Sequence, residues 1–469
     1  MSKLRAPVAN GEVLAVPGFD AIPALVEENR RRLNHDDVQI GGMSLRELRA
    51  LARREVLPSE SDAPLLLAGH QPELSHPGVW AKNFALNGLA KKIGGIPLNL
   101  IVDNDTLKST SLHFPALPHR GPKVHLESDA FDTFTGEVPY EDRSVVDAEF
   151  FRTFPDRAAP LWANWGYEPL LKSVWQPARN IGDTFTAVRR EQEAAWGCRN
   201  LELTVSRLSQ TEAFARFARS ILGDLSRFRD VYNATIRAYR KANGIRSNNH
   251  PAPELAAGEA PFWVRTSGGR RERATATSDV RQLRPRALTL TLFGRVSLGD
   301  FFIHGIGGGK YDEVTDDIIR NYFGIEPPAY QVLSATLHLP LPTFPSTPAD
   351  LKRAEHRVRD LHWNPQRHLV PQQLARPEVQ SLQSCKNTLI ANEPPPTDHT
   401  ARRAWFRELQ AVTIELRHFV WKQPTIAKSD LRRIRDEVAA NAVLQRRDYS
   451  WVLYPEATLR PFLQRFLKL

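Results

Sequence analysis

The segment between residues 64 and 102 constrains the fold more than any other part of the chain. Pro64–Gly69 is a short apolar run that ends on glycine, and Val79–Lys92 then repeats its apolar residues at helical spacing. Gly94-Gly95 stops this helix, and Ile96–Val102 is a second apolar run. Strand, helix and strand in this order form a βαβ unit, whose parallel strands are joined by a right-handed crossover. The sequence therefore predicts an α/β protein.

The patterns along the chain predict a Rossmann-like parallel sheet core with helical additions. Residues 1–60 are expected to form an N-terminal helical arm, with helices near Ala21–Leu33 and Ser44–Arg54, and Glu47 completes a capping box with Ser44. Four further parts follow: the first part of the core (61–145), a mainly helical connecting region (146–285), the second part of the core (286–345) and a C-terminal helical region (346–469).

The second half of the chain alternates predicted helices and strands. Thr211–Arg240 is a clear helix with a stop at Asn243-Gly244, and 246–285 is polar and turn-rich. Strands are expected at Ala287–Val296, where leucines alternate with threonines, and in two further segments, Phe301–His304 and Ser334–Leu341, with a helix at Tyr311–Phe323 between them.

The C-terminal region is predicted to be helical near Ala349–Leu361, Thr400–Lys422 and Ser429–Arg447. The last two helices could pair as an antiparallel, coiled-coil-like hairpin across Gln423-Pro424-Thr425.

Composition limits the classes of function. Lys and Arg number 63 against 53 Asp and Glu, and this excess favours an anionic small-molecule partner. Nucleic acid is disfavoured, because the chain shows no basic and aromatic RNA-recognition motif. Cys198 and Cys385, the two cysteines, fit a reducing compartment. No run approaches the roughly 20 apolar residues of a membrane span. We therefore expect a cytoplasmic protein without a membrane partner.

The turn Gly69-His70-Gln71-Pro72 is the first candidate site. It follows a strand and precedes a helix, which is where doubly wound sheets bind ligands and where free backbone N–H groups suit an anion. Lys82 and Asn83 lie further into the same helix. The alternative is a tight turn in which His70 hydrogen-bonds to the backbone.

Asp103-Asn104-Asp105 ends the second strand of the same unit. Carboxylates at this place could hold a ribose, an ammonium group or a metal, or could cap the next helix.

A glycine-rich segment after Phe301–His304 is the third candidate. Gly307, Gly308 and Gly309 could bring the backbone close to a ligand, and Lys310 and Tyr311 follow at the expected helix start. The spacing matches neither a P-loop nor a dinucleotide fingerprint, and a flexible connector is the alternative. Arg286, in Arg284-Pro-Arg286, suits a carboxylate or phosphate, or a structural ion pair. The 14 histidines show no zinc-protease spacing, so no metal site is predicted.

Taken in order, these landmarks resemble the cysteine-adding enzyme family of bacillithiol biosynthesis. The resemblance rests on Gly69–Leu74, Ile101–Asp105, Arg284-Pro-Arg286, Gly305–Tyr311 and Ser334–Leu337, and it covers roughly residues 60–345 and the helical tail. His70 replaces a glutamine of the family's turn, and Lys82 falls about two residues early, or about 200° around a helix. The resemblance implies a Rossmann-like fold, homodimerisation through the C-terminal helices, and nucleotide-like and carboxylate ligands.

The resulting hypothesis is a ligase or transferase that joins an amine-bearing substrate to an amino acid or an activated carboxyl group. His70 would act as acid or base, Asp103 and Asp105 would hold an ammonium group or hydroxyls, and Gly307–Lys310 with Arg286 would hold an anionic end. The cofactor is left open, with ATP or ADP as the candidate. A nucleotidyltransferase and a non-catalytic dimeric scaffold remain as alternatives.

Overall fold

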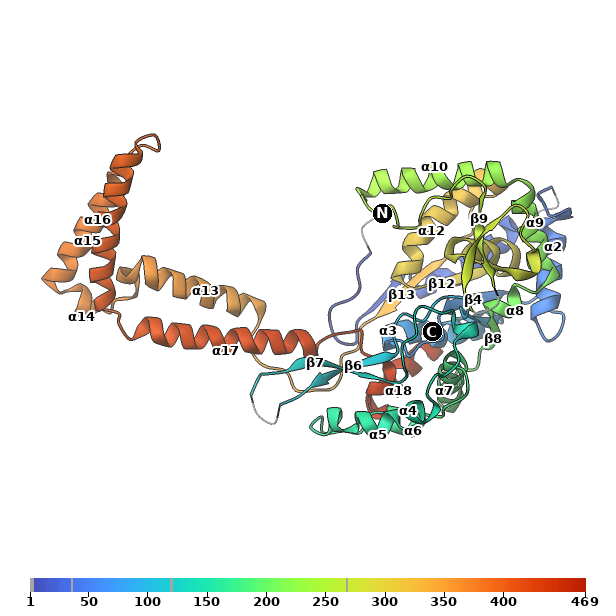
Figure 1. Cartoon of the computed structure of the whole chain (residues 1–469), viewed down its shortest axis with the longest axis horizontal. Helices are drawn as coiled ribbons and strands as arrows, with labels where there is room; N and C mark the ends of the chain where they lie inside the picture. The colour runs from blue at the N-terminus through green and yellow to red at the C-terminus, as the bar shows by residue number, and fades with distance from the viewer. Residues whose placement is uncertain (1–3, 35–36, 119–120, 267–268) are drawn as a thin grey trace. The chain divides into compact units, whose positions relative to one another are not determined.

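The computed structural model describes residues 4–34, 37–118, 121–266 and 269–469 (Figure 1). The chain groups into two compact units. The first contains Met1–Phe114, Glu127–Pro340 and Arg446–Leu469, and the second contains Pro115–Leu126 and Leu341–Gln445.

A six-stranded sheet forms the centre of the first unit. Its strands are β1 (Val13–Val16), β4 (Leu65–His70), β5 (Ile96–Ile101), β8 (Leu201–Thr204), β12 (Phe301–His304) and β13 (Gln331–Ala335), in the order β1-β13-β12-β4-β5-β8. All neighbours are parallel except β1, which runs antiparallel to β13. The chain proceeds outward from β4 through β5 to β8 and then returns to β12, so the strand order reverses between β4 and β12. This is the Rossmann-like arrangement with a topological switch point.

The predicted βαβ unit is confirmed. Helix α3 (Pro77–Ile93) connects β4 to β5, and Gly94, with φ of 64°, ends it in the left-handed conformation. Nearly every residue of α3 is buried, because the sheet covers one side and the returning C-terminal helix α18 (Glu456–Gln464) and the turn η9 (Arg465–Lys468) cover another. At Gly88, a Cβ atom would lie 2.1 Å from the Phe466 carbonyl oxygen. Glycine there permits the close contact of helix and tail.

The opposite face of the sheet is covered by helices from distant parts of the sequence. They include α2 (Leu45–Val56), α9 (Glu212–Gly223) and α10 (Leu225–Asn243). Leu67 and Leu100 of the sheet share one core with Phe214 and Phe217. Helices α1 (Ile22–Arg32) and α2 lie where the N-terminal pattern predicts them, and the capping box of Ser44 and Glu47 is present.

Two predictions about secondary structure in the first unit are wrong. Residues 246–285 contain a small antiparallel sheet of β9 (Glu259–Arg265), β10 (Arg271–Thr275) and β11 (Leu283–Pro285). The strand expected at Ala287–Val296 is helical, with α11 (Ala287–Leu292) followed by the π-helical turn η5 (Phe293–Leu298). The alternation of leucine and threonine did not mark a strand with one face in solvent. Thr289 is buried and its hydroxyl donates a hydrogen bond to the Pro261 carbonyl. The region 147–242 contains strand β8 among its helices.

The second unit is helical. Its long helices are α13 (Pro348–Trp363), α15 (Pro377–Ala391), α16 (His399–His418) and α17 (Gln423–Leu444). Helix α17 packs against α13, and α16 packs against α15. The expected hairpin of the last two helices is therefore wrong, because each pairs with an earlier helix, and α15 was not foreseen.

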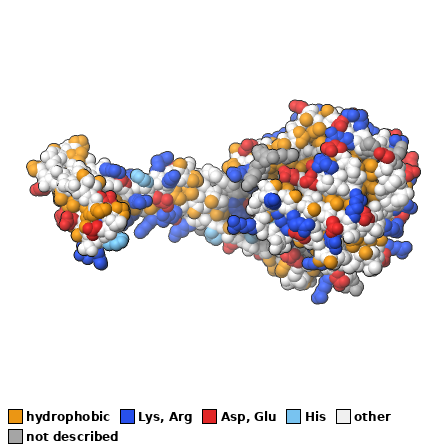
Figure 2. All heavy atoms as spheres, turned by 90° about the horizontal axis from the view of Figure 1, so that it is seen from above, with side chains coloured by type: hydrophobic (Ala, Val, Ile, Leu, Met, Phe, Trp, Pro, Cys, Tyr) orange, Lys and Arg blue, Asp and Glu red, His pale blue; other side chains and the backbone are white. Residues whose placement is uncertain are grey.

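Charge is dispersed on the visible surface. On the face of the first unit shown in Figure 2, basic and acidic side chains are interspersed. Within the described residues, no helix is both long enough and apolar enough to cross a membrane.

Candidate functional site

A cavity of about 480 Å³ lies at the carboxyl edge of the sheet, at the switch point. The ends of four parallel strands contribute to it, through Gly69 and His70 at the end of β4, Asp105 after β5, His304 on β12 and Ser334 on β13. A doubly wound sheet binds its ligands at this position, because the connections leave β4 and β12 in opposite directions and open a crevice between them.

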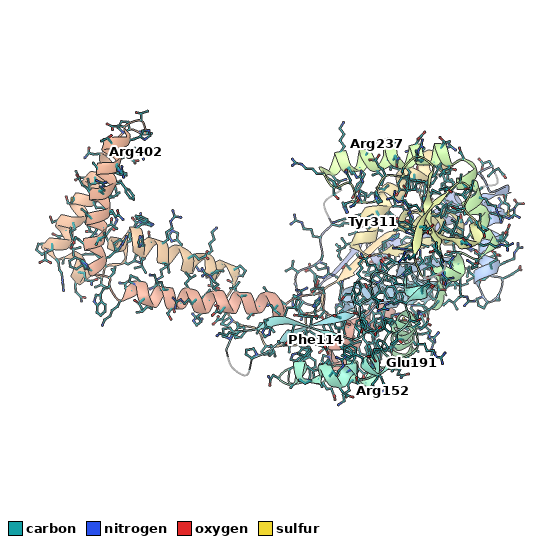
Figure 3. All side chains as sticks on the ribbon, in the orientation of Figure 1. Phe114, Arg152, Glu191, Arg237, Tyr311 and Arg402 are labelled. Atoms are coloured by element: carbon teal, nitrogen blue, oxygen red, sulfur yellow. The ribbon has the colours of Figure 1, made fainter. Side chains whose placement is uncertain are left out.

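Eleven of the sequence-predicted residues line this one cavity. They are Gly69, His70, Gln71, Lys82, Asn104, Asp105, Arg286, His304, Gly307, Gly308 and Tyr311. Tyr311, labelled in Figure 3, is on helix α12 (Ile306–Ile318). The three segments that the sequence singled out are thus brought together.

Five predicted residues lie outside the cavity: Pro72, Asn83, Asp103, Gly309 and Lys310. Pro72 is buried beneath the turn, and Lys310 is exposed on α12.

Two of these five have structural partners. Asp103 accepts hydrogen bonds from the backbone and the hydroxyl of Ser206, at the start of helix α8 (Val205–Leu208). Asp103 thus bonds to the first turn of a helix that follows β8, and not to the next helix of the chain. Asn83 donates to the buried Glu193 carboxylate at 2.7 Å.

The glycine-rich segment is not the flexible turn that was considered. Helix α12 already begins at Ile306, and none of Gly307, Gly308 and Gly309 has a positive φ. Packing explains two of these glycines instead. A Cβ atom at Gly308 would lie 2.9 Å from His304 Nδ1, and one at Gly309 would lie 2.3 Å from Val332 Cγ2.

Lys82 and Arg447 are buried or half-buried cations at the cavity wall. Lys82 is 3% exposed, and its Nζ donates to the Gly69 carbonyl at 3.0 Å. Arg447 donates to the Ser334 hydroxyl at 2.8 Å and the Ala335 carbonyl at 2.9 Å. Within the described part of the chain, neither side chain forms an ion pair with a carboxylate. Burial lowers the pKa of Lys82 to about 8 and also lowers the pKa of Arg447.

The wall opposite β4 comes from the small sheet. The guanidinium groups of Arg271 and Arg286 lie 5.0 and 4.1 Å from the ring centroid of Trp263, within cation–π range. Arg286 is paired with Glu259 at 2.7 Å, and Arg271 lies 3.6 Å from Asp105. These two arginines are therefore held in place by carboxylates, unlike Lys82 and Arg447.

His70 is a neutral histidine at the cavity wall. Its Nδ1 lies 3.2 Å from the Gln71 carbonyl and 3.5 Å from Glu73 Oε1, which are both acceptors, so Nδ1 carries the proton. Burial and the nearby Lys82 lower its pKa to about 3. The backbone contact of the alternative interpretation is thus present. It leaves Nε2 as a lone-pair acceptor.

His304 is held by a buried charge network behind the cavity. Its Nε2 lies 2.5 Å from Asp312 Oδ2, and Asp312 is also paired with Arg295 at 3.1 Å. Burial opposes ionisation of Asp312, but His304 and Arg295 outweigh it and lower the pKa of that carboxyl. Burial lowers the pKa of His304. The ionised Asp312 therefore fixes the proton on Nε2 and leaves Nδ1 unprotonated beside Gly308.

Sequence reasoning missed Trp263, Arg271, Ser334 and Arg447, which also line the cavity. Trp263 and Arg271 belong to strands β9 and β10 of the small sheet, in a segment where the sequence predicts turns. Arg447 follows the long helix α17, where its sequence context is that of a solvated basic helix end.

No group of three or more His, Cys, Asp or Glu side chains in the described ranges is arranged to hold a metal ion. The lining instead combines four cations (Lys82, Arg271, Arg286 and Arg447) with one carboxylate, Asp105. This composition suits an anionic organic ligand.

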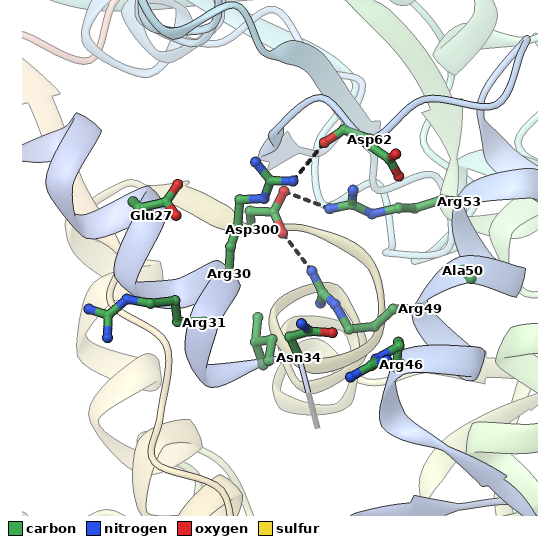
Figure 4. Close-up of a pocket in the computed structure, with 11 residues that line it drawn as sticks. Glu27, Arg30, Arg31, Asn34, Arg46, Arg49, Ala50, Arg53, Asp62 and Asp300 are labelled. Carbon is green, nitrogen blue, oxygen red and sulfur yellow. Dashed lines mark hydrogen bonds and ion pairs between the residues drawn. The ribbon is translucent and has the colours of Figure 1, made fainter. Parts of the chain in front are cut away.

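A second pocket of about 410 Å³ lies between α1 and α2 and is also rich in arginine (Figure 4). There, Arg49 and Arg53 each bind one oxygen of the buried Asp300 at 2.6 Å. Two of its basic side chains, Arg49 and Arg53, thus link helix α2 to Asp300, just before β12.

Fold and site together define an α/β protein with a Rossmann-like sheet and a cationic ligand cavity at its switch point. No protein-family profile matches the chain, and no curated protein matches it by sequence. The solved tyrosyl-tRNA synthetase of Archaeoglobus fulgidus, in complex with L-tyrosine, is similar over 89% of this chain and 99% of that chain, with 11% identity and a TM-score of 0.25. Similarity at this level has no bearing on the substrate of this chain.

Proposed function

We propose that the protein is a small-molecule ligase or transferase of the bacillithiol cysteine-adding type. In this proposal it joins an amine-bearing substrate to an amino acid or an activated carboxyl group in the switch-point cavity. The observation that carries the proposal is the pair Lys82 and Arg447, two cations at the wall of a ligand-sized cavity whose bonded partners are neutral. Glu73 and Asp448 favour these two charges from a distance but form no ion pair with them in the described residues, and burial outweighs their effect. An anionic substrate would supply the missing direct partner.

The neutral histidines fit the proton transfer that such a reaction needs. A primary amine must lose a proton before it can attack a carboxyl carbon, and a histidine accepts a proton only while it is neutral. His70 offers Nε2, and His304 offers Nδ1, each with the other ring nitrogen fixed by an acceptor. An anion bound by Lys82 would also raise the low pKa of His70 and make it a better base.

The homodimer is part of the same proposal. The helices and turns of the second unit carry several exposed apolar side chains, namely Ile390, Phe406, Ile414, Trp421 and Ile426. Sedimentation of the wild type and of Trp421→Glu tests it. A dimer that the substitution dissociates would support it, and a wild-type monomer would overturn it.

Turnover tests the catalytic proposal. Purified protein would be incubated with amino acids, amino sugars, dicarboxylates and ATP, and new C–N products would be sought by mass spectrometry. We expect a product whose formation falls at least about 100-fold in His70→Ala, because general acid–base catalysis contributes about 10²–10⁴-fold. If a ligand binds but no product forms, the catalytic proposal is wrong and the non-catalytic scaffold is favoured.

A further inference from the structure

A second cavity, of about 320 Å³, adjoins the switch-point cavity. Gln71 and Asp105 line both cavities, and they are joined by a hydrogen bond of 2.8 Å from Gln71 Nε2 to Asp105 Oδ2. His70 of the first cavity also lies 3.5 Å from Glu73 of the second. Two contacts thus connect the second cavity with the switch-point cavity.

The charge of the second cavity is opposite to that of the first. Its lining has two carboxylates, Glu73 and Asp105, and one cation, Lys108; Glu73 and Lys108 are both exposed. The first cavity has four cations and one carboxylate. Two adjoining chambers of opposite sign suit two substrates of opposite charge.

Tyr140 is an independent indication of a ligand. Its side chain is 3% exposed, it lines the second cavity, and within the described residues its hydroxyl forms no hydrogen bond. The hydroxyl oxygen is not among the fully buried unpartnered atoms of the described residues, so it is open to the cavity and free to bond to a ligand there. Burial, then Glu73 and Asp105, raise the pKa of Tyr140, which places its hydroxyl in the field of both carboxylates.

The apolar part of the wall consists of Leu74, Leu107, Leu112, Phe131 and Phe185, and Thr106, Ser109 and Ser111 also line the cavity. It would contact the carbon skeleton of a ligand, and the polar groups would contact its head.

We infer that this second cavity binds the ammonium group of the amine-bearing substrate, through Glu73, Asp105 and the Tyr140 hydroxyl. An ammonium group has three N–H donors and no acceptor, and these three side chains offer oxygens to match. The inference rests on the proposed function and extends it, since it assigns the amine to one chamber and the anion to the other. His70 lies at the boundary between the two cavities, with its Nδ1 toward Glu73.

Two matched probes test the inference, each measured on the full chain at pH 7. Cyclohexylamine carries an ammonium group, and cyclohexanol has the same ring with a hydroxyl. We expect cyclohexylamine to bind at least tenfold more tightly by calorimetry. Glu73→Gln should weaken that binding about tenfold or more, and Tyr140→Phe about threefold or more, while Arg46→Met, in the pocket between α1 and α2, leaves it unchanged.

Malate, measured in parallel, separates this inference from the proposed function. Lys82→Met should weaken malate binding, and Tyr140→Phe should not. Equal binding of cyclohexylamine and cyclohexanol, absence of amine binding, or insensitivity to Glu73→Gln would each overturn the second chamber. If only the malate measurement fails, so that Lys82→Met does not weaken malate binding, the result would contradict the anion site in the switch-point cavity and not the ammonium site. Melting temperatures of Tyr140→Phe and Glu73→Gln within a few degrees of the wild type would show that both variants are folded.

Discussion

Two pockets of the first unit are rich in basic side chains, but their cations have different partners. In the pocket between α1 and α2, Arg49 and Arg53 bind the two oxygens of Asp300, which also accepts from the Leu65 backbone (Figure 4). At the switch point, Lys82 and Arg447 bond to carbonyls and a hydroxyl.

The number of cations therefore does not identify a ligand site. The pocket between α1 and α2 has five arginines against three carboxylates, Glu27, Asp62 and Asp300. Two of those arginines are paired with Asp300 inside the protein. The distinguishing feature of the switch-point cavity is a buried positive charge whose hydrogen-bond partners are neutral. We expect substitutions in the two pockets to have opposite effects on stability.

The largest effect is expected from Asp300→Ala. It would leave Arg49 and Arg53 buried without their shared carboxylate and would lower the free energy of unfolding by about 3–5 kcal/mol. Chemical denaturation measures the change. Asp62→Ala is the matched control, because Asp62 is exposed and offers its backbone carbonyl to Arg30, and it should stay within about 0.5 kcal/mol of the wild type. An Asp300→Ala variant as stable as the wild type would contradict the assigned link.

Lys82→Met should change stability in the other direction. The pKa of Lys82 is lowered from 10.5 to about 8, so its charged form is disfavoured in the folded chain. Removing the charge should raise the free energy of unfolding at pH 7 by about 1–2 kcal/mol, after the loss of the bond to Gly69 is deducted.

The pH dependence of this difference is a second check on Lys82. The unfolded chain binds more protons between pH 8 and pH 10.5, so the disadvantage of the wild type is complete below pH 8 and shrinks as the pH rises. A destabilised Lys82→Met variant would show that the lysine is structural.

His70 affects the stability of the folded chain in acid. Its folded pKa is lowered to about 3, whereas the unfolded value lies near 6.5. As the pH falls between these values, the unfolded chain takes up a proton that the folded chain does not, and the free energy of unfolding falls by about 1.4 kcal/mol per pH unit for this group. Denaturation of His70→Gln between pH 4 and 6 should show a slope shallower by that amount. Identical slopes would mean that His70 is protonated in the folded chain.

The sequence predicts the core of the site because the site follows strand ends. His70 and His304 each close an apolar run, and parallel strands bring such ends to one edge of the sheet. The alternation of side-chain directions along a strand predicts nothing beyond the end of that strand. Strand β5 ends at Ile101, so the spacing of Asp103 and Asp105 no longer fixes their directions, and only Asp105 reaches the cavity.

The missed part of the site comes from tertiary structure. Strand β10, which carries Arg271, is polar and mostly exposed, so no apolar pattern marks it. Arg447 reaches the sheet from the far end of the sequence, and its bonds to Ser334 and Ala335 have no local signal. Within the described residues, the lack of a direct ion pair on Lys82 is likewise a property of the folded surroundings.

Malate binding to the wild type and to Lys82→Met, measured by isothermal titration calorimetry at pH 7, tests the central claim most directly. Arg46→Met, in the pocket between α1 and α2, is the matched control, and the neutral diamide of malate controls for charge. We predict that Lys82→Met weakens malate binding at least tenfold, which is about 1.4 kcal/mol, while Arg46→Met leaves it unchanged and the diamide does not bind. Equal affinity of the wild type and Lys82→Met would contradict the assignment of the switch-point cavity as an anion site.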